Sequence, residues 1–165
     1  MPTLNSIELT AMQQSHTAKC TARTKQEIQE RGGCIGFDEY MKLVLHDNTV
    51  GYYHVQQQIF GEDGDFTTAP EASVHLAYCV AHACAKLIHD DPQRAILEIG
   101  AGSGRLARDV ITYLHSWGQL PTHYYIYDPS EPLVTKQKKF LEAKVPEQFP
   151  IIKWLPDLYS EMESV

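Results

Sequence analysis

Residues 94–104 read RAILEIGAGSG, a short apolar run followed directly by three glycines within five residues. Downstream, apolar residues repeat at the spacing of one helix face: Leu106, Ala107, Val110, Ile111 and Leu114. The run 94–99 is typical of a buried strand. Glycines let the chain turn sharply after it, because glycine adopts positive φ at little cost. The stretch therefore predicts a strand, a tight turn and a helix in immediate succession.

The same alternation continues toward the C-terminus. HYYIYD at 123–128 predicts a second strand, and PIIKWL at 150–155 predicts a third. Between them an amphipathic helix is indicated by Leu133, Val134, Gln137, Phe140 and Leu141. Strands that alternate with helices pair in parallel through right-handed crossovers. We therefore predict an α/β fold of the Rossmann-like, doubly wound type.

Toward the N-terminus the pattern is less regular. We expect a flexible tail over 1–24, a helical and irregular extension over 25–92, and a partial α/β domain over 93–160. Within the extension, one helix is predicted from Phe37 to Leu45. A second is predicted from an N-cap at Thr68, with Glu71 completing a capping box, to about His89. The predicted core stripe of this second helix is Leu76, Val80, Ala83, Cys84 and Leu87.

Composition narrows the class of protein. The chain has 165 residues, with 14 Lys plus Arg against 21 Asp plus Glu and a formal charge of −7. This excess of acid argues against nucleic-acid binding, which depends on basic side chains that neutralise phosphates. The four cysteines form no CxxC pair, which favours a reducing compartment. The sequence has no apolar run of the length that predicts a membrane span. Its N-terminus does not have the pattern of a secretory signal. We expect a cytoplasmic protein, or a mitochondrial one in a eukaryote.

The glycine turn is where a ligand would bind. Its backbone N–H groups at a helix N-terminus favour a polar ligand, although a turn with no ligand is the alternative. The dinucleotide-binding motif GxGxxG does not match the sequence when it starts at Gly100, because Arg105 stands where the third glycine should be. When it starts at Gly102, the variant GxGxxA does match, so a dinucleotide stays possible. Glu98 decides between these ligands, because a buried carboxylate repels a pyrophosphate and suits the sulfonium and ammonium of S-adenosylmethionine. Asp128, at the end of the second strand, could accept both ribose hydroxyls.

A series of motifs in this order is specific to one family. They are Gly33-x-Ile-x-Phe37, Tyr40-Met41, Gly51-Tyr-Tyr, GDFTTAPE at 64–71, LEIGAGSG at 97–104, Asp128-x-Ser130-x-x-Leu133-x-x-x-Gln137, and Trp154. Together they resemble the MidA-type S-adenosylmethionine-dependent methyltransferases, over residues 27–158. The resemblance implies a class I methyltransferase fold. It also implies an arginine of a protein as the methyl acceptor, since the mitochondrial members are arginine methyltransferases that assist assembly of respiratory complex I.

The same resemblance assigns site residues. Glu98, Gly100, Gly102 and Gly104 would surround the methionine end of the cofactor, and Asp128 would bind its ribose. Asp65, Thr67 and Pro70 would lie against the pocket, and Asp157 would bind the adenine amino group. Asp128 stands where the family usually has Glu. The family's asparagine–glutamate motif on the fourth strand is absent, so the chain resembles an N-terminal, cofactor-binding fragment, and its catalytic residues are unknown.

Other functions stay open. The chain could be a non-catalytic relic or interaction module that self-associates through an exposed sheet edge, or a fragment of a dinucleotide-binding oxidoreductase. His75, His82 and His89 repeat every seven residues, but this stripe lies opposite the predicted core and is expected to be solvated rather than to bind a metal. Lys136, Lys138, Lys139 and Lys144 are likewise expected on a solvated face.

Overall fold

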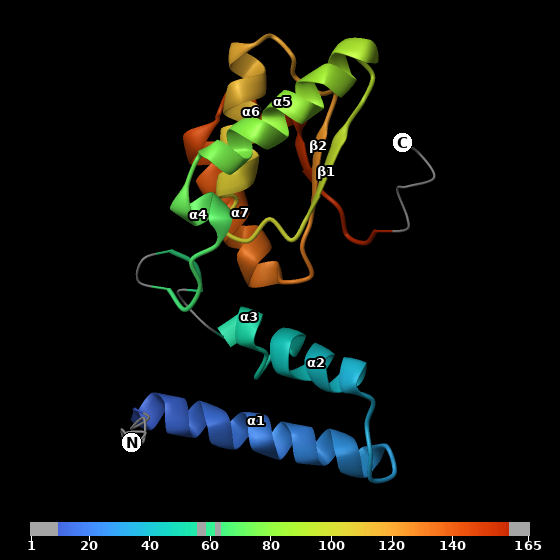
Figure 1. Cartoon of the computed structure of the whole chain (residues 1–165). Coiled ribbons are helices and arrows are strands. Elements are labelled where there is room, and N and C mark those ends of the chain that lie inside the picture. Colours follow the sequence, from blue (N-terminus) through green and yellow to red (C-terminus); the bar gives the residue numbers. More distant parts are fainter. Residues whose placement is uncertain (1–9, 56–58, 62–63, 159–165) are drawn as a thin grey trace, which may run out of the picture. The chain divides into compact units, whose positions relative to one another are not determined.

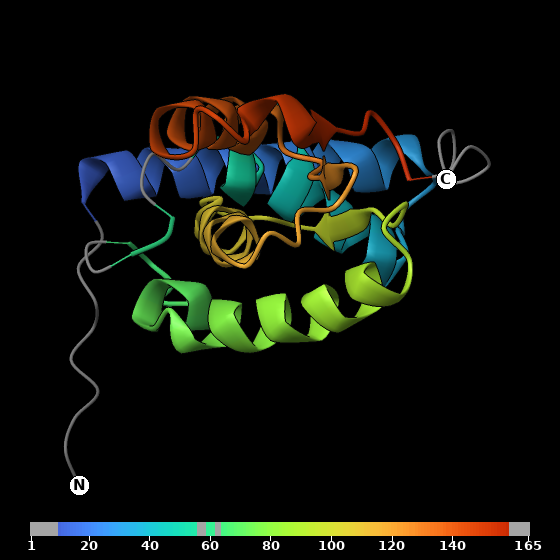
Figure 2. The same cartoon turned by 90° about the horizontal axis from the view of Figure 1, so that it is seen from above.

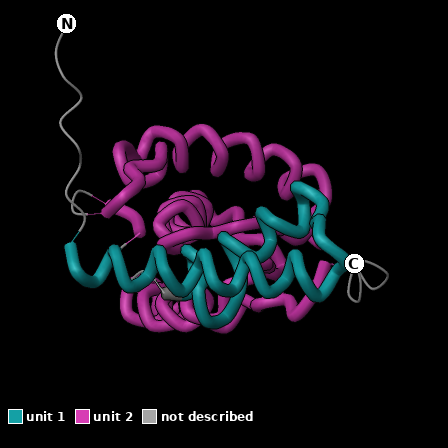
Figure 3. Tube along the Cα trace, turned by 90° about the horizontal axis from the view of Figure 1, so that it is seen from below, with its two compact units in different colours: residues 1–56 teal, residues 57–165 magenta. Residues whose placement is uncertain are grey.

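The computed structural model describes residues 10–55, 59–61 and 64–158. The chain divides into two compact units, residues 1–56 and 57–165 (Figure 3). This division differs from the predicted segments 1–24, 25–92 and 93–160, because the second half of the predicted extension packs with the strands. Among the described residues, no helix combines the length and apolar character needed to cross a bilayer.

The first unit contains α1 (Ala11–Glu30), α2 (Phe37–His46) and α3 (Tyr52–Val55). Residues 11–24 of the predicted tail 1–24 are helical, and residues 1–9 of it lie outside the described residues. Its helix begins with a capping box, in which the Thr10 side chain accepts the Gln13 N–H and the Gln13 side chain accepts the Thr10 N–H. α1 buries no residue, so its sequence lacks the apolar stripe that would have predicted a helix. α2 confirms the predicted helix from Phe37.

The second unit begins with α4 (Ala69–Ala72) and α5 (His75–Asp90). We predicted one helix here, but Ser73 is extended (φ −160°, ψ 137°) and separates the two. The predicted Thr68 capping box is also wrong, because Thr68 makes no side-chain cap hydrogen bond. The buried residues of α5 are Ala77, Ala81 and Ile88, whereas the predicted core residues Leu76 and Leu87 are exposed. α5 packs against α6, and small alanines allow that close approach.

Three parallel strands follow, as predicted, and they lie in the sheet in the order β1-β2-β3. They are β1 (Ile96–Ile99), β2 (Tyr124–Tyr127) and β3 (Ile152–Trp154). The connections contain α6 (Arg105–Ser116), α7 (Glu131–Lys144) and the short 3₁₀ turn η1 (Phe149–Ile151). The predicted Rossmann-like fold class is confirmed by this topology and by the structural comparison given below.

The two faces of the sheet differ in burial. α5, α6 and α7 gather on one face (Figures 1 and 2). Ile96, Tyr124, Ile126 and Ile152 pack with these helices in the core. Leu97 and Ile99, which point to the other face, are 41% and 63% exposed. Within the second unit, no described residue covers this second face of β1, and we refer to it as the open face.

Candidate functional site

The glycine loop connects the end of β1 to the start of α6. Gly100, Gly102 and Gly104 all have positive φ, at 74°, 56° and 84°, while Ala101 between them is buried. The Gly100 N–H donates to the Tyr127 carbonyl at 2.8 Å, which fixes the loop against the end of β2. Positive φ at alternate positions is the reason for three glycines, because residues with a Cβ rarely adopt it.

Space around the loop is uneven. A Cβ placed on Gly102 would lie 3.3 Å from the ring of Phe60, so this aromatic side chain already packs on the loop. A Cβ placed on Gly100 would meet nothing within 4 Å. Room for a ligand against the backbone therefore exists at Gly100, next to the carboxyl end of β1, where ligands of open α/β sheets bind.

Glu98 points to the helix-covered face of the sheet, although its neighbours Leu97 and Ile99 point to the open face. Its Oε2 accepts the hydroxyl of Tyr124 at 2.8 Å. Burial raises the pKa of the Glu98 carboxyl, the hydrogen bond from Tyr124 opposes that shift, and the charge of Asp128 adds to it. Burial likewise raises the pKa of Tyr124 well above its ordinary value. A carboxylate in this setting is stabilised by a cationic ligand group.

Asp128 follows β2 at the same edge of the sheet. Its Oδ1 accepts the N–H of Ser130 at 3.0 Å, and its Oδ2 accepts Nε2 of Gln137 at 2.8 Å. Each oxygen keeps a second lone pair. The carboxylate is thus held in place and can still accept the two hydroxyls of a ribose.

A third carboxylate, Glu71 on α4, fastens the GDFTTAPE segment to the glycine loop. It accepts the hydroxyl of Ser103, and its Oε2 lies 2.9 Å from Nε of Arg105. The Glu71 side chain is 5% exposed. Glu71 belongs to the GDFTTAPE motif but was predicted only as part of a helix cap, because its tertiary contact has no local signal in the sequence.

The remaining predicted site residues lie at different distances from this arrangement. Gly104 is the N-cap of α6. Pro70 lies in α4 beside Glu71, whereas Asp65 and Thr67 are exposed residues of the preceding loop. Asp157 is exposed in the stretch after β3. The structure therefore brings Glu98, the glycines and Asp128 together, and the roles of Asp65, Thr67, Pro70 and Asp157 stay predictions.

The other clusters found in the sequence lie on the surface. The histidine stripe His75, His82 and His89 is exposed on α5, and the four lysines of α7 are exposed as well. Within the described part of the chain, no group of three or more His, Cys, Asp or Glu side chains is placed to hold a metal ion. All four cysteines are free.

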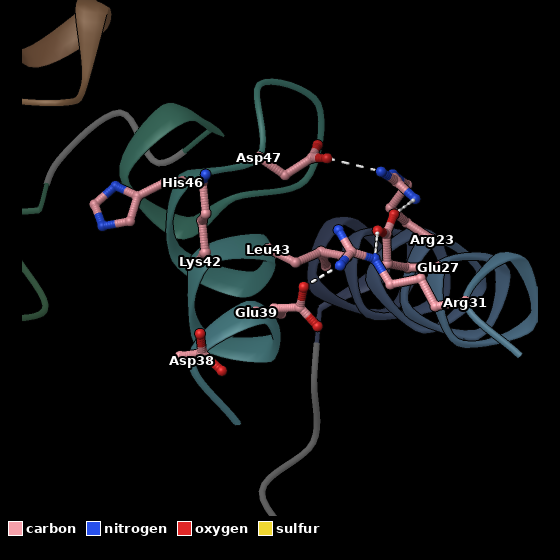
Figure 4. A pocket seen from close by; sticks show the side chains of 9 residues that line it. All are labelled: Arg23, Glu27, Arg31, Asp38, Glu39, Lys42, Leu43, His46 and Asp47. Atoms are coloured by element: carbon pink, nitrogen blue, oxygen red, sulfur yellow. Dashed lines mark hydrogen bonds and ion pairs between the residues drawn. The ribbon is translucent and has the colours of Figure 1, made fainter. Parts of the chain in front are cut away.

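The first unit has a hollow of its own, of about 430 Å³, lined by residues of α1 and α2 and by Asp47 (Figure 4). Arg23 contacts Glu27 at 2.9 Å and Asp47 at 3.3 Å. Arg31 contacts Glu27 at 2.6 Å and also Glu39. Since both guanidinium groups are engaged by acids of this unit, the ionic network fastens α1 to α2.

Comparisons with known proteins bear on the family of the chain. A family model described as "Putative S-adenosyl-L-methionine-dependent methyltransferase" matches residues 78–164. The crystal structure of a Burkholderia thailandensis protein bound to S-adenosyl-homocysteine matches 93% of this chain with a TM-score of 0.82 and 32% identity. This chain covers 41% of that protein.

Two curated relatives are similar in sequence. The mitochondrial protein arginine methyltransferase NDUFAF7 homologue of Caenorhabditis elegans is 30% identical over 116 residues, and that of Drosophila melanogaster is 36% identical over 91 residues. The matches cover 66% and 53% of this chain. They span only 27% and 20% of the length of those relatives.

Proposed function

Because the chain belongs to the MidA-type family of S-adenosylmethionine-dependent methyltransferases, we propose that its second unit binds S-adenosylmethionine at the carboxyl edge of β1 and β2. The observation that carries this proposal is the pairing of a half-buried carboxylate, Glu98, with a glycine loop that is open at Gly100. The sulfonium and ammonium of the cofactor complement the acid. Asp128 accepts the ribose hydroxyls.

The reaction we propose is methyl transfer to a protein, with an arginine side chain as the acceptor. The curated relatives are named protein arginine methyltransferases, which favours this acceptor. The resemblance described above extends the proposal to a subunit of a respiratory complex as the partner, in mitochondria if the chain is eukaryotic. Bound S-adenosylmethionine would supply a methyl group activated by the sulfonium.

The residues of this chain would bind and orient rather than transfer protons. The leaving thioether is neutral, so alignment of acceptor and methyl group contributes most of the acceleration. Glu98 would hold the cationic end of the cofactor, and Asp128 would fix the rotation of its nucleoside. We assign no general base among the described residues, and the acceptor-binding groups are proposed to lie in a further part of the fold or in a partner chain.

Isothermal titration of the full chain with S-adenosylmethionine, S-adenosylhomocysteine and NADH tests the cofactor. We expect binding of the first two and not of NADH. Asp128→Asn should weaken binding of S-adenosylhomocysteine by about tenfold or more, because a charge-assisted hydrogen bond contributes ~1.5–3 kcal/mol. Glu142→Gln, on the exposed side of α7, is the matched control for charge. Preferential binding of NADH would support the dinucleotide alternative and refute the proposal.

The open face favours a second candidate function, an interaction module that self-associates. Leu97 and Ile99 expose apolar surface on a strand that pairs with β2 on one side. Such surfaces are typical of interaction sites. Sedimentation analysis separates the candidates: a dimer that Ile99→Lys converts to monomer supports the module, whereas a concentration-independent monomer contradicts it.

A further inference from the structure

Gln137 is a polar residue in an apolar position. It lies on α7, where the other buried residues are Leu133 and Leu141, and it is 0% exposed. An amide in such a place is unfavourable unless its hydrogen-bonding groups are satisfied. A leucine or methionine would fill similar space without that requirement. Packing alone therefore does not explain a glutamine here.

Its amide makes three hydrogen bonds to three different elements. Nε2 donates to the carbonyl of Gly102 at 3.0 Å and to Oδ2 of Asp128 at 2.8 Å. Oε1 accepts the indole N–H of Trp154 at 3.0 Å. The glycine loop, the end of β2 and the end of β3 are thus joined by a single side chain.

The orientation of this amide is determined by its partners. The indole nitrogen of Trp154 is only a donor, so the atom facing it must be the amide oxygen. A flipped amide would place its oxygen against a carbonyl and a carboxylate, both of which are acceptors. Trp154 therefore fixes the direction in which Gln137 donates.

Asp128 gains its position from the same network. Gln137 holds one carboxylate oxygen and the Ser130 N–H holds the other, at 3.0 Å. The Gly102 carbonyl, bound by the same Nε2, belongs to the loop proposed to surround the methionine end of the cofactor. A single amide nitrogen therefore bridges the loop and the carboxylate proposed to bind the ribose.

We propose that Gln137, oriented by Trp154, is a positioning residue that holds the glycine loop and Asp128 in the spacing the nucleoside needs. The proposal rests on the proposed function. Gln137 itself lies beneath the site and acts through the Gly102 carbonyl and Asp128. It differs from a structural core residue in that its loss should alter ligand affinity more than stability.

The test compares S-adenosylhomocysteine binding by the full chain with that of Gln137→Met, Trp154→Phe and Ile111→Val. Gln137→Met keeps the volume and removes all three bonds, so we expect the Kd to rise about tenfold. Trp154→Phe removes the donor to Oε1, which loosens the amide, and should raise the Kd about threefold to fivefold, the equivalent of one hydrogen bond. Ile111→Val shortens a fully buried residue of α6 outside the network and should leave the Kd unchanged.

Gln137→Glu supplies a readout that a purely structural role would not change. A carboxylate at 137 faces the acceptors Asp128 and Gly102 and repels them, whereas a protonated carboxyl can still donate one bond. The variant should therefore bind S-adenosylhomocysteine better as pH falls, relative to the unmodified chain at each pH. A parallel pH profile for the two proteins would count against the inference.

Hydrogen exchange of the Trp154 indole N–H, one of only two indole signals in the chain, needs no ligand. It should be protected in the unmodified chain and exchange faster in Gln137→Met. If the unmodified chain binds S-adenosylhomocysteine and Gln137→Met binds it within twofold, the positioning role is refuted and the proposed function stands. If the unmodified chain binds neither cofactor form, both are refuted together.

Discussion

Replacing Glu71 by Gln tests how the GDFTTAPE segment is fastened to the glycine loop. The carboxylate, 5% exposed, accepts from Ser103 and pairs with Arg105, whose side chain is 44% exposed. A hydrogen bond to a charged group contributes about 1.5–3 kcal/mol, and a half-exposed ion pair about 0.2–1 kcal/mol. Gln keeps one acceptor oxygen but loses the charge. We therefore expect the free energy of unfolding of the second unit to fall by about 1–2 kcal/mol.

Urea denaturation followed by tryptophan fluorescence measures this change, since Trp117 and Trp154 both lie in the second unit. The double variant Glu71→Gln with Ser103→Ala completes a double-mutant cycle, in which we expect a coupling energy of about 1 kcal/mol. Glu142→Gln is the control for loss of an exposed charge. If the two single effects add to within about 0.3 kcal/mol, the bond between Glu71 and Ser103 does not fasten the segment and the reasoning is wrong.

Three further predictions follow from contacts described above. The raised pKa of Glu98 means that the folded unit binds the carboxyl proton more tightly than the unfolded chain does, so the free energy of unfolding should fall as pH rises from the ordinary Glu pKa of 4.5 through the folded value. Glu98→Gln should remove this pH dependence in a series of Tm measurements, and an unchanged pH dependence would contradict the prediction. Gly102→Ala should lower the free energy of unfolding by about 1–2 kcal/mol because of its left-handed backbone, and by more because the new Cβ contacts Phe60. Gly118→Ala, with φ 66° and no atom within 4 Å of the new Cβ, should lose only the backbone part. Equal losses of unfolding free energy in a denaturation experiment would exclude the Phe60 contact. Raising NaCl to ~1 M, where the Debye length is about 3 Å, should speed amide exchange of α1, which is held by ion pairs, but not of α5, which packs through Ala77, Ala81 and Ile88. Equal responses of the two helices would show that ion pairs do not fasten α1.

The elements that the sequence predicted well are those with local signals. The three strands are short apolar runs, and α6 has a clear apolar stripe of which Ala107, Val110, Ile111 and Leu114 are buried. Glycines at 100, 102 and 104 mark positive φ, which is a property of the backbone at those positions. Each of these features can be recognised without knowing what the segment packs against.

The elements that were missed depend on contacts between distant segments. α1 buries nothing, so only its Thr10–Gln13 capping box could have indicated where it starts. The predicted core face of α5 was right at Val80 and Cys84, which pack against the core, but wrong at Leu76 and Leu87, because these larger residues were favoured over the alanines that are buried.

In the site, Glu98 and Asp128 were predicted from chemistry at strand ends, but their partners were not. The Tyr124 hydroxyl comes from the neighbouring strand, and Ser103 is 32 positions from Glu71. Gln137 was counted among the core positions of its helix, although a glutamine within an apolar stripe, and its place with Asp128 and Trp154 in the family motifs, pointed to a polar network beneath the site.

The alternation of side chains along β1 has a mechanical consequence. Leu97 and Ile99 flank Glu98 and project from the opposite side of the same short strand. Any segment that packs on those two side chains would restrict motion of the β1 backbone and so fix the position of the Glu98 carboxylate between them. A layer that covers the apolar face of β1 would therefore also increase the affinity for a cofactor bound near Glu98, without contacting that cofactor.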